Sequence, residues 1–368
     1  MKILVVQDYL RSGGTERQSV LLATAFAQAG HDTHLVTFRP GGALQPEKAT
    51  SGLTLTSLQR RDSKLDWWAP GLIRHAGSIA PDIVLCMGRM ANSYGGSLQK
   101  ALPKAAIIST LRTGKSLPWT FRRSLRRTRH VIANSRAAHD HLTAEHKIAS
   151  DHISVIANAL VFGPTDEPTD SNARALLRQK HGATAQDHVL LCVAMFRPEK
   201  NQIALVEMAS RLPTDFPYQL WLAGEGSALN ACRKKANELS LNDRVKFLGW
   251  LTDPRPLYAA ADLAVHASKR ESLSNFLIEA QAHGLPAVAC VARGIDETFI
   301  DGESGHLIPA GDMDTFSKTV TAVCQNPKTL RAMGERGREN ALAQFSSDAQ
   351  IKAHLDLFLK LASLDSTA

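Results

Sequence analysis

Two acidic residues, Glu271 and Glu279, stand eight positions apart in the stretch ADLAVHASKRESLSNFLIEAQAHGLPAVAC, which covers residues 261–290. Carboxylates accept hydrogen bonds from sugar hydroxyls, and their spacing brings both toward the start of any helix that begins between them. The pattern therefore predicts a site that holds a polyhydroxylated ligand.

The elements that must position these acids follow from the apolar pattern around them. Apolar runs at 261–267 and 286–291 predict two strands. Gly284, with the proline two residues later, predicts the end of the intervening helix. We expect that helix to begin near Ser274 or Asn275, so that its unpaired N–H groups and positive dipole end suit a phosphate.

A purely structural interpretation of the two acids exists. Glu279 would complement the helix dipole and Glu271 would be a solvated loop charge. Neither candidate N-cap puts Glu279 at the third helical position, so a capping box does not explain it.

The string ESLSNFLIEAQAHGLPAVA resembles the E-x7-E signature of glycosyltransferase family 4, retaining enzymes of the GT-B fold. The resemblance implies that Glu271 contacts hydroxyls of the donor sugar and that Glu279 holds the nucleotide ribose. It also implies that four consecutive backbone amides contact the sugar and the diphosphate of the donor. These are the amides of Ser272, Leu273, Ser274 and Asn275. Ser272 stands where glycine is usual in the family, which narrows the expected sugar pocket.

Length and composition bound the class of protein. The 368 residues suffice for two domains, and 44% hydrophobic with 21% charged residues describe a soluble globular protein. No stretch has the length of a transmembrane helix, and the N-terminal MKILVVQ leads straight into a strand without a signal peptide. We expect a cytoplasmic protein.

Cysteine spacing and charge distribution add two expectations. The five cysteines are widely spaced and contain no C-x-x-C pair, so buried reduced thiols are expected. Residues 1–160 contain 21 Lys plus Arg against 10 Asp plus Glu, whereas the remainder contains 22 against 25. The first half is expected to meet something anionic.

A glycine loop follows the first strand. Residues 2–6 are apolar, Gly13 and Gly14 follow, and a helical pattern runs from 18 to 29. A Gly-Gly pair alone is more often a turn than a site, and this one is no dinucleotide fingerprint. GGTERQ, however, resembles the GGxER opening loop of family 4, which implies that it lines the cleft by the donor phosphates and acceptor.

Further strands are predicted at 33–38, 83–87, 106–110 and 130–133, with a helix at 72–79. Strands that alternate with helices indicate a parallel, doubly wound sheet. Ligands of such sheets bind at the carboxyl ends of the strands.

The segment 101–130 is basic, contains no acidic residue, and includes an aromatic anchor at Trp119. Its arginines include Arg122, Arg123, Arg126 and Arg127. This combination suits an anionic membrane surface. Nucleic acid would satisfy the same charges, and a solvated helix face is the structural alternative. The resemblance favours a membrane or lipid-linked acceptor, and we expect no nucleic-acid partner.

Arg112 is the candidate for a catalytic position near the strand that ends at Thr110. Many relatives have a histidine there, over the sugar, whereas this chain reads STLRTGKS. An arginine is a poor general base because it does not deprotonate in proteins.

Three segments are expected. Residues 1–165 form an acceptor-side Rossmann-like domain, residues 174–346 a nucleotide-sugar-binding Rossmann-like domain, and residues 347–368 a helical tail. The stretch 163–172, GPTDEPTDSN, is the predicted linker. The tail has an apolar stripe at helical spacing, formed by Ile351, Leu355, Phe358, Leu359 and Ala362. The resemblance implies that this stripe packs back on the first domain.

The second half begins with a strand at 188–196 and the turn RPEKNQ. Basic residues at a strand-to-helix turn can neutralise a diphosphate, Arg as a fork and Lys as a point charge, although an RPEK turn alone would be ordinary surface. The turn resembles the family's G-R-x-x-x-E-K-G/N, in which Arg and Lys hold the donor diphosphate. Lys200 matches that pattern; Met195 occupies the usual Arg position, and Arg197 is its expected substitute.

Two later strands carry further candidates. Residues 218–223 lead into Gly224, which resembles L-x-G-x-G, and RVKFLGWL at 244–251 resembles V-x-F-L-G. The turn after that strand reaches the nucleobase in the family, which makes Trp250 and Leu251 its expected neighbours. The motifs fall in the family's order across nearly the whole chain.

The sequence therefore predicts a GT-B protein: two Rossmann-like, doubly wound parallel-sheet domains facing across a cleft that holds a nucleotide sugar. The resemblance implies hexose transfer with retention, by front-side attack in which the donor phosphate takes the acceptor proton. Asp312 and Asp314 form a D-x-D pair at an expected helix start, so no metal and no other cofactor are expected. The alternatives are a GT-B nucleotide-sugar epimerase and a non-catalytic nucleotide-sugar binder.

Overall fold

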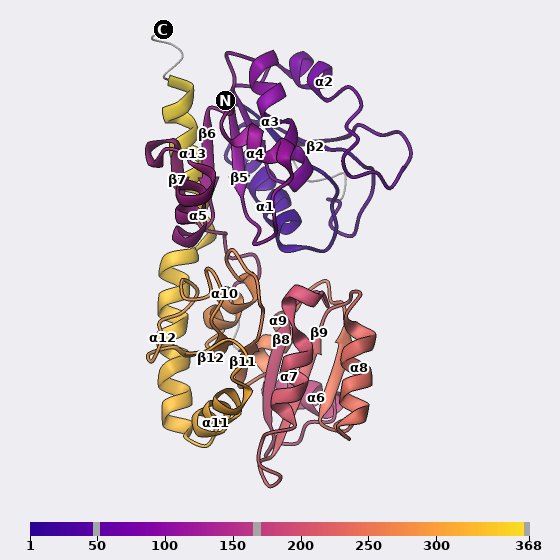
Figure 1. The fold of residues 1–368 in the computed structure, drawn as a ribbon, viewed down its shortest axis with the longest axis vertical. Coiled ribbons are helices and arrows are strands. Elements are labelled where there is room, and N and C mark those ends of the chain that lie inside the picture. The colour runs from indigo at the N-terminus through magenta and orange to yellow at the C-terminus, as the bar shows by residue number, and fades with distance from the viewer. Residues whose placement is uncertain (47–51, 165–170, 364–368) are drawn as a thin grey trace. The chain divides into compact units, whose positions relative to one another are not determined.

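The computed structural model describes residues 1–46, 52–164 and 171–363. The chain divides into two compact units, Met1–Val161 with Ser347–Ala368 and Phe162–Ser346. Most of the predicted linker, residues 165–170, lies outside the described residues. Each unit is an α/β structure built on its own parallel sheet (Figure 1).

The first unit contains a seven-stranded sheet in the order β3-β2-β1-β4-β5-β6-β7, in which every pairing is parallel. Its strands are β1 (Lys2–Gln7), β2 (Asp32–Thr37), β3 (Leu53–Ser57), β4 (Ile83–Cys86), β5 (Ala106–Leu111), β6 (His130–Ala133) and β7 (Ile153–Val155). The helices are α1 (Gly14–Gln28), α2 (Leu72–Ile79), α3 (Arg89–Ala101), α4 (Trp119–Leu125), α5 (Arg136–His146) and α13 (Ser347–Ser363), with a short 3-10 turn at Ser150–His152. The four predicted strands after β1 are confirmed to within about two residues.

The C-terminal helix α13 belongs to the first unit. Phe358 is fully buried and meets the ring of Phe26 from α1 edge-on at 5.4 Å between centroids. The predicted apolar stripe is wrong at Leu359, which is 56% exposed. Leu361 is buried in its place, because a 3.6-residue repeat carries the buried face from 358 to 361.

The second unit contains six parallel strands in the order β10-β9-β8-β11-β12-β13. They are β8 (His188–Val193), β9 (Tyr218–Ala223), β10 (Val245–Gly249), β11 (Leu263–His266), β12 (Ala287–Cys290) and β13 (Gly305–Ile308). The helices are α6 (Ser171–Lys180), α7 (Gln202–Ala209), α8 (Leu229–Glu238), α9 (Arg255–Ala260), α10 (Asn275–Ala282), α11 (Met313–Cys324) and α12 (Pro327–Phe345), with a 3-10 turn at Pro198–Lys200. This is the strand order of a dinucleotide-binding fold.

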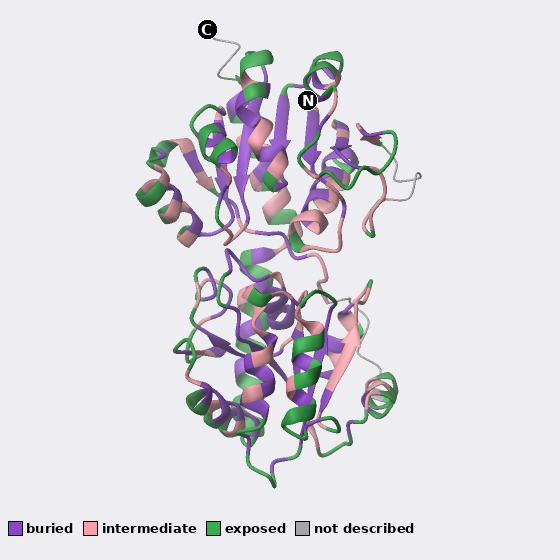
Figure 2. Cartoon of the chain, turned by 45° about the vertical axis from the view of Figure 1, so that its right-hand side comes forward, coloured by how far each residue is buried: buried purple, intermediate pink, exposed green. Residues whose placement is uncertain are grey.

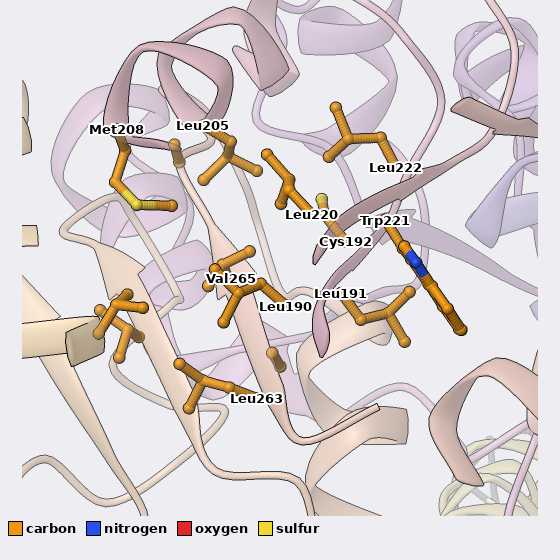
Figure 3. Close-up of a cluster of buried hydrophobic side chains, with 14 of the residues drawn as sticks. Leu190, Leu191, Cys192, Leu205, Met208, Leu220, Trp221, Leu222, Leu263 and Val265 are labelled. Atoms are coloured by element: carbon orange, nitrogen blue, oxygen red, sulfur yellow. The ribbon is translucent and has the colours of Figure 1, made fainter. Parts of the chain in front are cut away.

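The core of the second unit forms where the central strands meet α7. Leu190 of β8 and Leu220 of β9 are fully buried on the side of the sheet that faces Leu205 of α7, whereas Leu191 and Trp221 point to the opposite face (Figure 3). Strands covered by helices on both faces require such continuous apolar runs. Figure 2 shows the central strands of each unit as buried and the outer sides of the surrounding helices as exposed, whereas the edge strands β3 and β10 are mostly half-buried.

The prediction of buried, reduced cysteines is confirmed, since all five thiols are free and buried. Burial raises the pKa of the Cys86 and Cys192 thiols to about 12, which keeps both protonated. None of the helices in the described ranges is long and apolar enough to cross a membrane.

Candidate active site

The N-terminus of α10 is the centre of the candidate site in the second unit. Ser274 is the N-cap, and its hydroxyl accepts a hydrogen bond from the backbone N–H of Leu277 at 3.4 Å. The predicted helix start is confirmed. The residues before it are tightly packed: Gly294 has φ +72°, and a Cβ there would overlap the Ser272 carbonyl oxygen. The backbone that leads into the helix is thereby held in place.

Glu271 lies in the loop before α10, and its buried carboxylate receives two partners on one oxygen. The Nζ of Lys200 forms an ion pair with Oε1 of Glu271, and the Nε2 of His266 lies 3.0 Å from the same atom. Among the described residues, Oε2 has no hydrogen bond. That oxygen retains its capacity to accept a hydroxyl from a ligand.

The charge state of Glu271 follows from these contacts. Burial acts to raise the pKa of its carboxyl, but Lys200 and the hydrogen bond from His266 outweigh burial and lower the pKa to about 2. Burial also lowers the pKa of His266, so this ring is neutral and donates Nε2–H to the carboxylate. The cluster is an ionised Glu, a charged Lys and a neutral His.

Glu279 lies in α10 and is also buried. The hydroxyl of Tyr258, on α9, donates to its Oε2 at 2.6 Å. The Tyr258 ring stacks near Phe276 at 6.3 Å between centroids. Tyr258 thus fixes the orientation of the carboxylate that the resemblance assigns to the ribose.

The turn after β8 supplies the basic groups. The 3-10 turn Pro198–Lys200 places Lys200 against Glu271, while Arg197 donates from Nη2 to the Met195 sulfur at 3.1 Å. No carboxylate of the described residues pairs with Arg197. Its charge is therefore not neutralised by any described carboxylate.

The loops after β9 and β10 complete this edge of the second sheet. Gly224 has φ +139°, and a Cβ there would overlap the carbonyl oxygen of Ala194 after β8. Trp250 and Leu251 follow β10 and are half-buried; the indole Nε1 of Trp250 has no partner among the described residues. The carboxyl ends of β8, β9, β10 and β11 thus carry the predicted donor residues of this unit.

The glycine loop of the first unit stands at the start of α1. Gly13 is the N-cap and Gly14 the first helical residue. Neither glycine has a positive φ; Gly13 instead leaves room for the Glu16 side chain, which a Cβ would overlap. Gln18 anchors this helix, because its amide donates to the Ala159 carbonyl at 2.6 Å and accepts from the Ala159 N–H at 3.0 Å.

Arg112 lies after β5 in the first unit, buried and without an acidic partner. Its Nη1 donates to Oδ1 of Asn158 at 2.6 Å, and its Nη2 lies 3.2 Å from Nε2 of His354 on α13. The Nδ1–H of His354 donates to the Gln350 carbonyl at 2.7 Å, so Nε2 accepts from the arginine. No carboxylate of the described residues pairs with Arg112, and its Nε is unpaired.

Burial determines the charge of this group as well. It lowers the pKa of Arg112 to about 10 and, with the arginine nearby, lowers the pKa of His354 to about 3. Arg112 therefore remains a cation with neutral partners, which is the environment expected of a residue that receives an anion.

The basic segment is exposed where the sequence places its arginines. Trp119 is 66% exposed and opens α4, with the Arg123 guanidinium 5.3 Å from its ring centroid. Four arginines of this segment are exposed: Arg122, Arg123, Arg126 and Arg127. The opposite side of the helix is buried through Phe121 and Leu125.

The D-x-D pair has structural roles. Asp312 is the N-cap of α11 and accepts from the Thr315 N–H at 2.9 Å, whereas Asp314 pairs with Arg211. Within the described ranges, no cluster of His, Cys, Asp and Glu has the geometry of a metal site.

Sequence reasoning missed four residues that orient the candidate site: His266, Tyr258, Asn158 and His354. The only signal for His266 is a histidine at the carboxyl end of an apolar strand. Asn158 stands in ISVIANA, at the asparagine of a strand motif that resembles the family's I-x-V-I-x-N-G, whereas Tyr258 and His354 come from elements distant in sequence and no local pattern points to them.

Comparison with known proteins identifies the class. Residues 12–160 match the family model described as Glycosyltransferase Family 4, and residues 173–340 match Glycosyl transferases group 1. The structure of HepE from Anabaena, in complex with UDP, superimposes with a TM-score of 0.83 at 21% identity and covers 98% of this chain and 100% of that one. The chain has the GT-B fold.

Curated glycosyltransferases are similar in sequence to this chain over part of their length. The lipopolysaccharide core biosynthesis glycosyltransferase LpsE of Rhizobium meliloti is 33% identical over 50% of this chain and 53% of that protein. The putative glycosyltransferase EpsD of Bacillus subtilis is 33% identical over 51% of this chain and 50% of that protein. The chain spans about half the length of these relatives. With both family models in order along the sequence, the chain belongs to glycosyltransferase family 4.

Proposed function

We propose that this chain is a retaining, metal-independent glycosyltransferase. It moves a hexose from a nucleotide-diphosphate sugar, with a UDP-sugar favoured, to a glycan or lipid-linked acceptor in cell-surface polysaccharide, lipopolysaccharide or glycolipid synthesis. The observation that carries the proposal is the buried Glu271 carboxylate, held by Lys200 and His266 at the N-terminus of α10. Relatives named for lipopolysaccharide core synthesis support the acceptor class.

Donor binding follows from the charges at this edge of the sheet. Lys200 and Arg197 neutralise the diphosphate together with the N–H groups at the start of α10. Oε2 of Glu271 accepts a sugar hydroxyl, and Glu279, oriented by Tyr258, accepts from the ribose. Trp250 and Leu251 lie beside the base.

The chemical step needs no protein nucleophile. The bond from the anomeric carbon to the phosphate oxygen breaks, and the acceptor oxygen bonds to that carbon on the same face. The acceptor proton passes to the leaving phosphate oxygen. The cationic side chains stabilise the negative charge that develops on the diphosphate, which is the transition-state term that a divalent metal supplies in other enzymes.

Arg112 takes part through its unneutralised charge. Neutral partners orient its guanidinium, and an anionic group of the donor or acceptor would supply its missing counter-charge. Such a pair forms only when the ligand is bound, so it contributes to binding rather than to folding.

We place the protein in the cytoplasm, bound peripherally at the inner face of the membrane. The exposed arginines and Trp119 on α4 support this, because basic residues beside an aromatic ring suit an anionic lipid surface.

The first test is a thermal-shift screen of nucleoside diphosphates and their sugars, without metal and then with magnesium. Selective stabilisation by one nucleotide family without metal supports the donor site. A uridine nucleotide is the first to try, since a fold neighbour was solved with UDP. No shift with any nucleotide would refute the donor assignment.

Variants separate donor binding from membrane binding. Glu279→Ala is expected to abolish the nucleotide shift, whereas Arg126→Ala with Arg127→Ala should preserve it and weaken vesicle association. Product analysis by NMR then tests retention at the anomeric carbon. Release of an epimerised free sugar without acceptor would favour the epimerase, and donor binding without hydrolysis or transfer would favour the non-catalytic binder.

A further inference from the structure

An exposed aromatic pair lies in the first unit, outside every motif described above. Trp67 is 57% exposed, Trp68 43% and Leu65 40%, all in the connection between β3 and α2. Single exposed apolar residues are ordinary on protein surfaces, but three within four positions are not. We call residues 60–68 the Trp67 loop.

The backbone of the Trp67 loop is braced from within. The Gln59 amide, which is buried, donates to the carbonyl of Leu65 at 3.1 Å and to that of Trp68 at 2.7 Å, and it accepts from the Ser63 hydroxyl at 2.7 Å. These hydrogen bonds use only backbone oxygens of the apolar residues. The rings are therefore held in solvent by a fixed backbone.

A second brace comes from α3. The hydroxyl of Tyr94 donates to the Trp67 carbonyl at 2.8 Å, and the Tyr94 ring packs edge-on against Phe38 at 5.4 Å. The same helix packs closely on α4 and the residues just after it through Gly95 and Gly96, where a Cβ would crowd Ser124 and Arg127. One helix thus supports both the Trp67 loop and the segment that begins at Trp119.

The acidic residues of the loop form ion pairs with arginines of the same unit. Arg39, which is buried, donates to Asp62 at 2.7 and 2.9 Å and to Asp66 at 2.5 Å. Arg11 also binds Asp66. The hydrogen bond from Arg39 lowers the pKa of Asp62 to about 2, so the pair stays ionised.

The basic residues of the loop are left facing solvent. Arg60, Arg61 and Lys64 are exposed, and within the described ranges no carboxylate forms an ion pair with them. The exposed residues of the Trp67 loop therefore include two indole rings, a leucine and three cations without an ion-pair partner in the described ranges, while the exposed Asp62 is paired with Arg39.

We propose that the Trp67 loop is a membrane anchor that inserts its indole rings into the interfacial region of an anionic lipid bilayer. Tryptophan favours that region because its ring is apolar while its N–H remains hydrated. Cations beside the rings attract anionic headgroups. An exposed leucine next to three cations fits a lipid surface better than a sugar ring, which needs hydrogen-bonding groups around the aromatic face. The inference rests on the proposed membrane association and adds a second contact to α4.

The test is co-sedimentation of the full chain with phosphatidylcholine vesicles that contain, or lack, 30% phosphatidylglycerol. We compare wild type with Trp67→Ala plus Trp68→Ala and with Arg60→Gln plus Arg61→Gln. The matched control is Leu176→Ala plus Leu359→Ala, which removes two exposed leucines outside the loop, 66% and 56% exposed. Nucleotide-induced thermal shift in each preparation checks that the variant is folded.

We expect the tryptophan variant to lose about tenfold or more in partition to anionic vesicles. Each arginine removed should lower partition roughly fivefold at low salt, and the control should bind as wild type does. Brominated lipids should quench wild-type indole fluorescence and quench the tryptophan variant much less. Unchanged partition of the tryptophan variant would overturn the anchor while leaving membrane association by α4 intact.

Two other outcomes are also decisive. If wild type fails to bind anionic vesicles, both membrane assignments fail, and nucleotide binding still tests the transferase separately. If the tryptophan variant binds vesicles normally but loses affinity for a soluble oligosaccharide acceptor, the rings belong to a glycan site and the anchor is refuted.

Discussion

Removal of Lys200 tests whether the cluster around Glu271 is built for a ligand or only for stability. The pKa of the buried Glu271 carboxyl is lowered from an ordinary 4.5 to about 2 even though burial opposes this. At about 1.4 kcal/mol per pKa unit, the shift corresponds to about 3 kcal/mol of stabilisation at neutral pH. Because the folded pKa is depressed, this stabilisation is complete above the unfolded pKa near 4.5 and is lost as the pH falls toward 2.

Lys200→Met leaves a buried carboxylate with only the His266 hydrogen bond. We expect a loss of about 2–3 kcal/mol at pH 7, or about 5–10 °C in melting temperature for a domain of this size. In the double variant Lys200→Met with Glu271→Gln, the buried charge is gone and the glutamine oxygen still accepts from His266. Most of the stability should return, with a coupling energy of about 1 kcal/mol or more.

Nucleotide binding should follow a different pattern. A charge-assisted hydrogen bond to the diphosphate is worth roughly 1.5–3 kcal/mol, so both Lys200 variants should bind about 10- to 150-fold more weakly. Urea unfolding measures stability and calorimetric titration measures affinity, with Lys269→Met as a control at an exposed lysine nearby. If the double variant recovers both properties, the lysine serves folding alone. If it recovers neither stability nor affinity, the pairing argument is wrong.

Three further predictions concern packing and orientation. The buried ring of His354, with a pKa of about 3, must gain a proton on unfolding, so the free energy of unfolding of wild type should fall by about 2 kcal/mol between neutral pH and pH 5. His354→Gln should remove this loss. Equal dependence of the unfolding free energy on pH in both proteins between pH 6.5 and 3, measured by urea melts, would contradict this. Gly294→Ala should cost more than about 2 kcal/mol and weaken nucleotide binding, whereas Gly302→Ala, with a similar φ in open space, should cost about 1 kcal/mol and leave binding unchanged. Tyr258→Phe should lower nucleotide affinity about tenfold by calorimetry, whereas Tyr218→Phe loses an equally buried hydroxyl bond without affecting affinity; matched affinities would exclude the orienting role.

The elements that the sequence predicted correctly are those with a local signal. The apolar runs that became β9 and β11 and the serine cap of α10 each contain their own start and stop residues. The regular alternation of these runs with helices was sufficient to predict parallel sheets, since a strand that continues in the same direction needs a crossover helix. Each of these inferences depended on neighbouring residues only.

The predictions that failed or were absent depended on distant contacts. Leu359 and Leu361 differ by two positions in one helix, and which of them is buried depends on how α13 rotates against Phe26. His354 reaches Arg112 across 242 positions of sequence. No periodicity encodes such a contact, because it is a property of the tertiary packing.

The Trp67 loop illustrates a second limit. Its sequence, RRDSKLDWW, has mixed charges and resembles a solvated turn. The structure separates the two signs of charge by their partners, since Asp62 and Asp66 pair with Arg39 and Arg11, whereas the loop's own cations form no ion pair in the described ranges. Net charge counted along a segment therefore understates the charge that a partner meets.

The two groups of basic residues should respond differently to salt. Lys200 is a quarter exposed and touches a buried carboxylate, so its interactions act over a few ångströms and are weakly screened. The arginines of α4 and of the Trp67 loop are exposed and would act on headgroups across solvent, where 0.5 M salt reduces the Debye length to about 4 Å. Raising the salt should therefore release the protein from anionic vesicles while nucleotide affinity changes little. Parallel loss of both activities would mean that one basic surface serves both ligands.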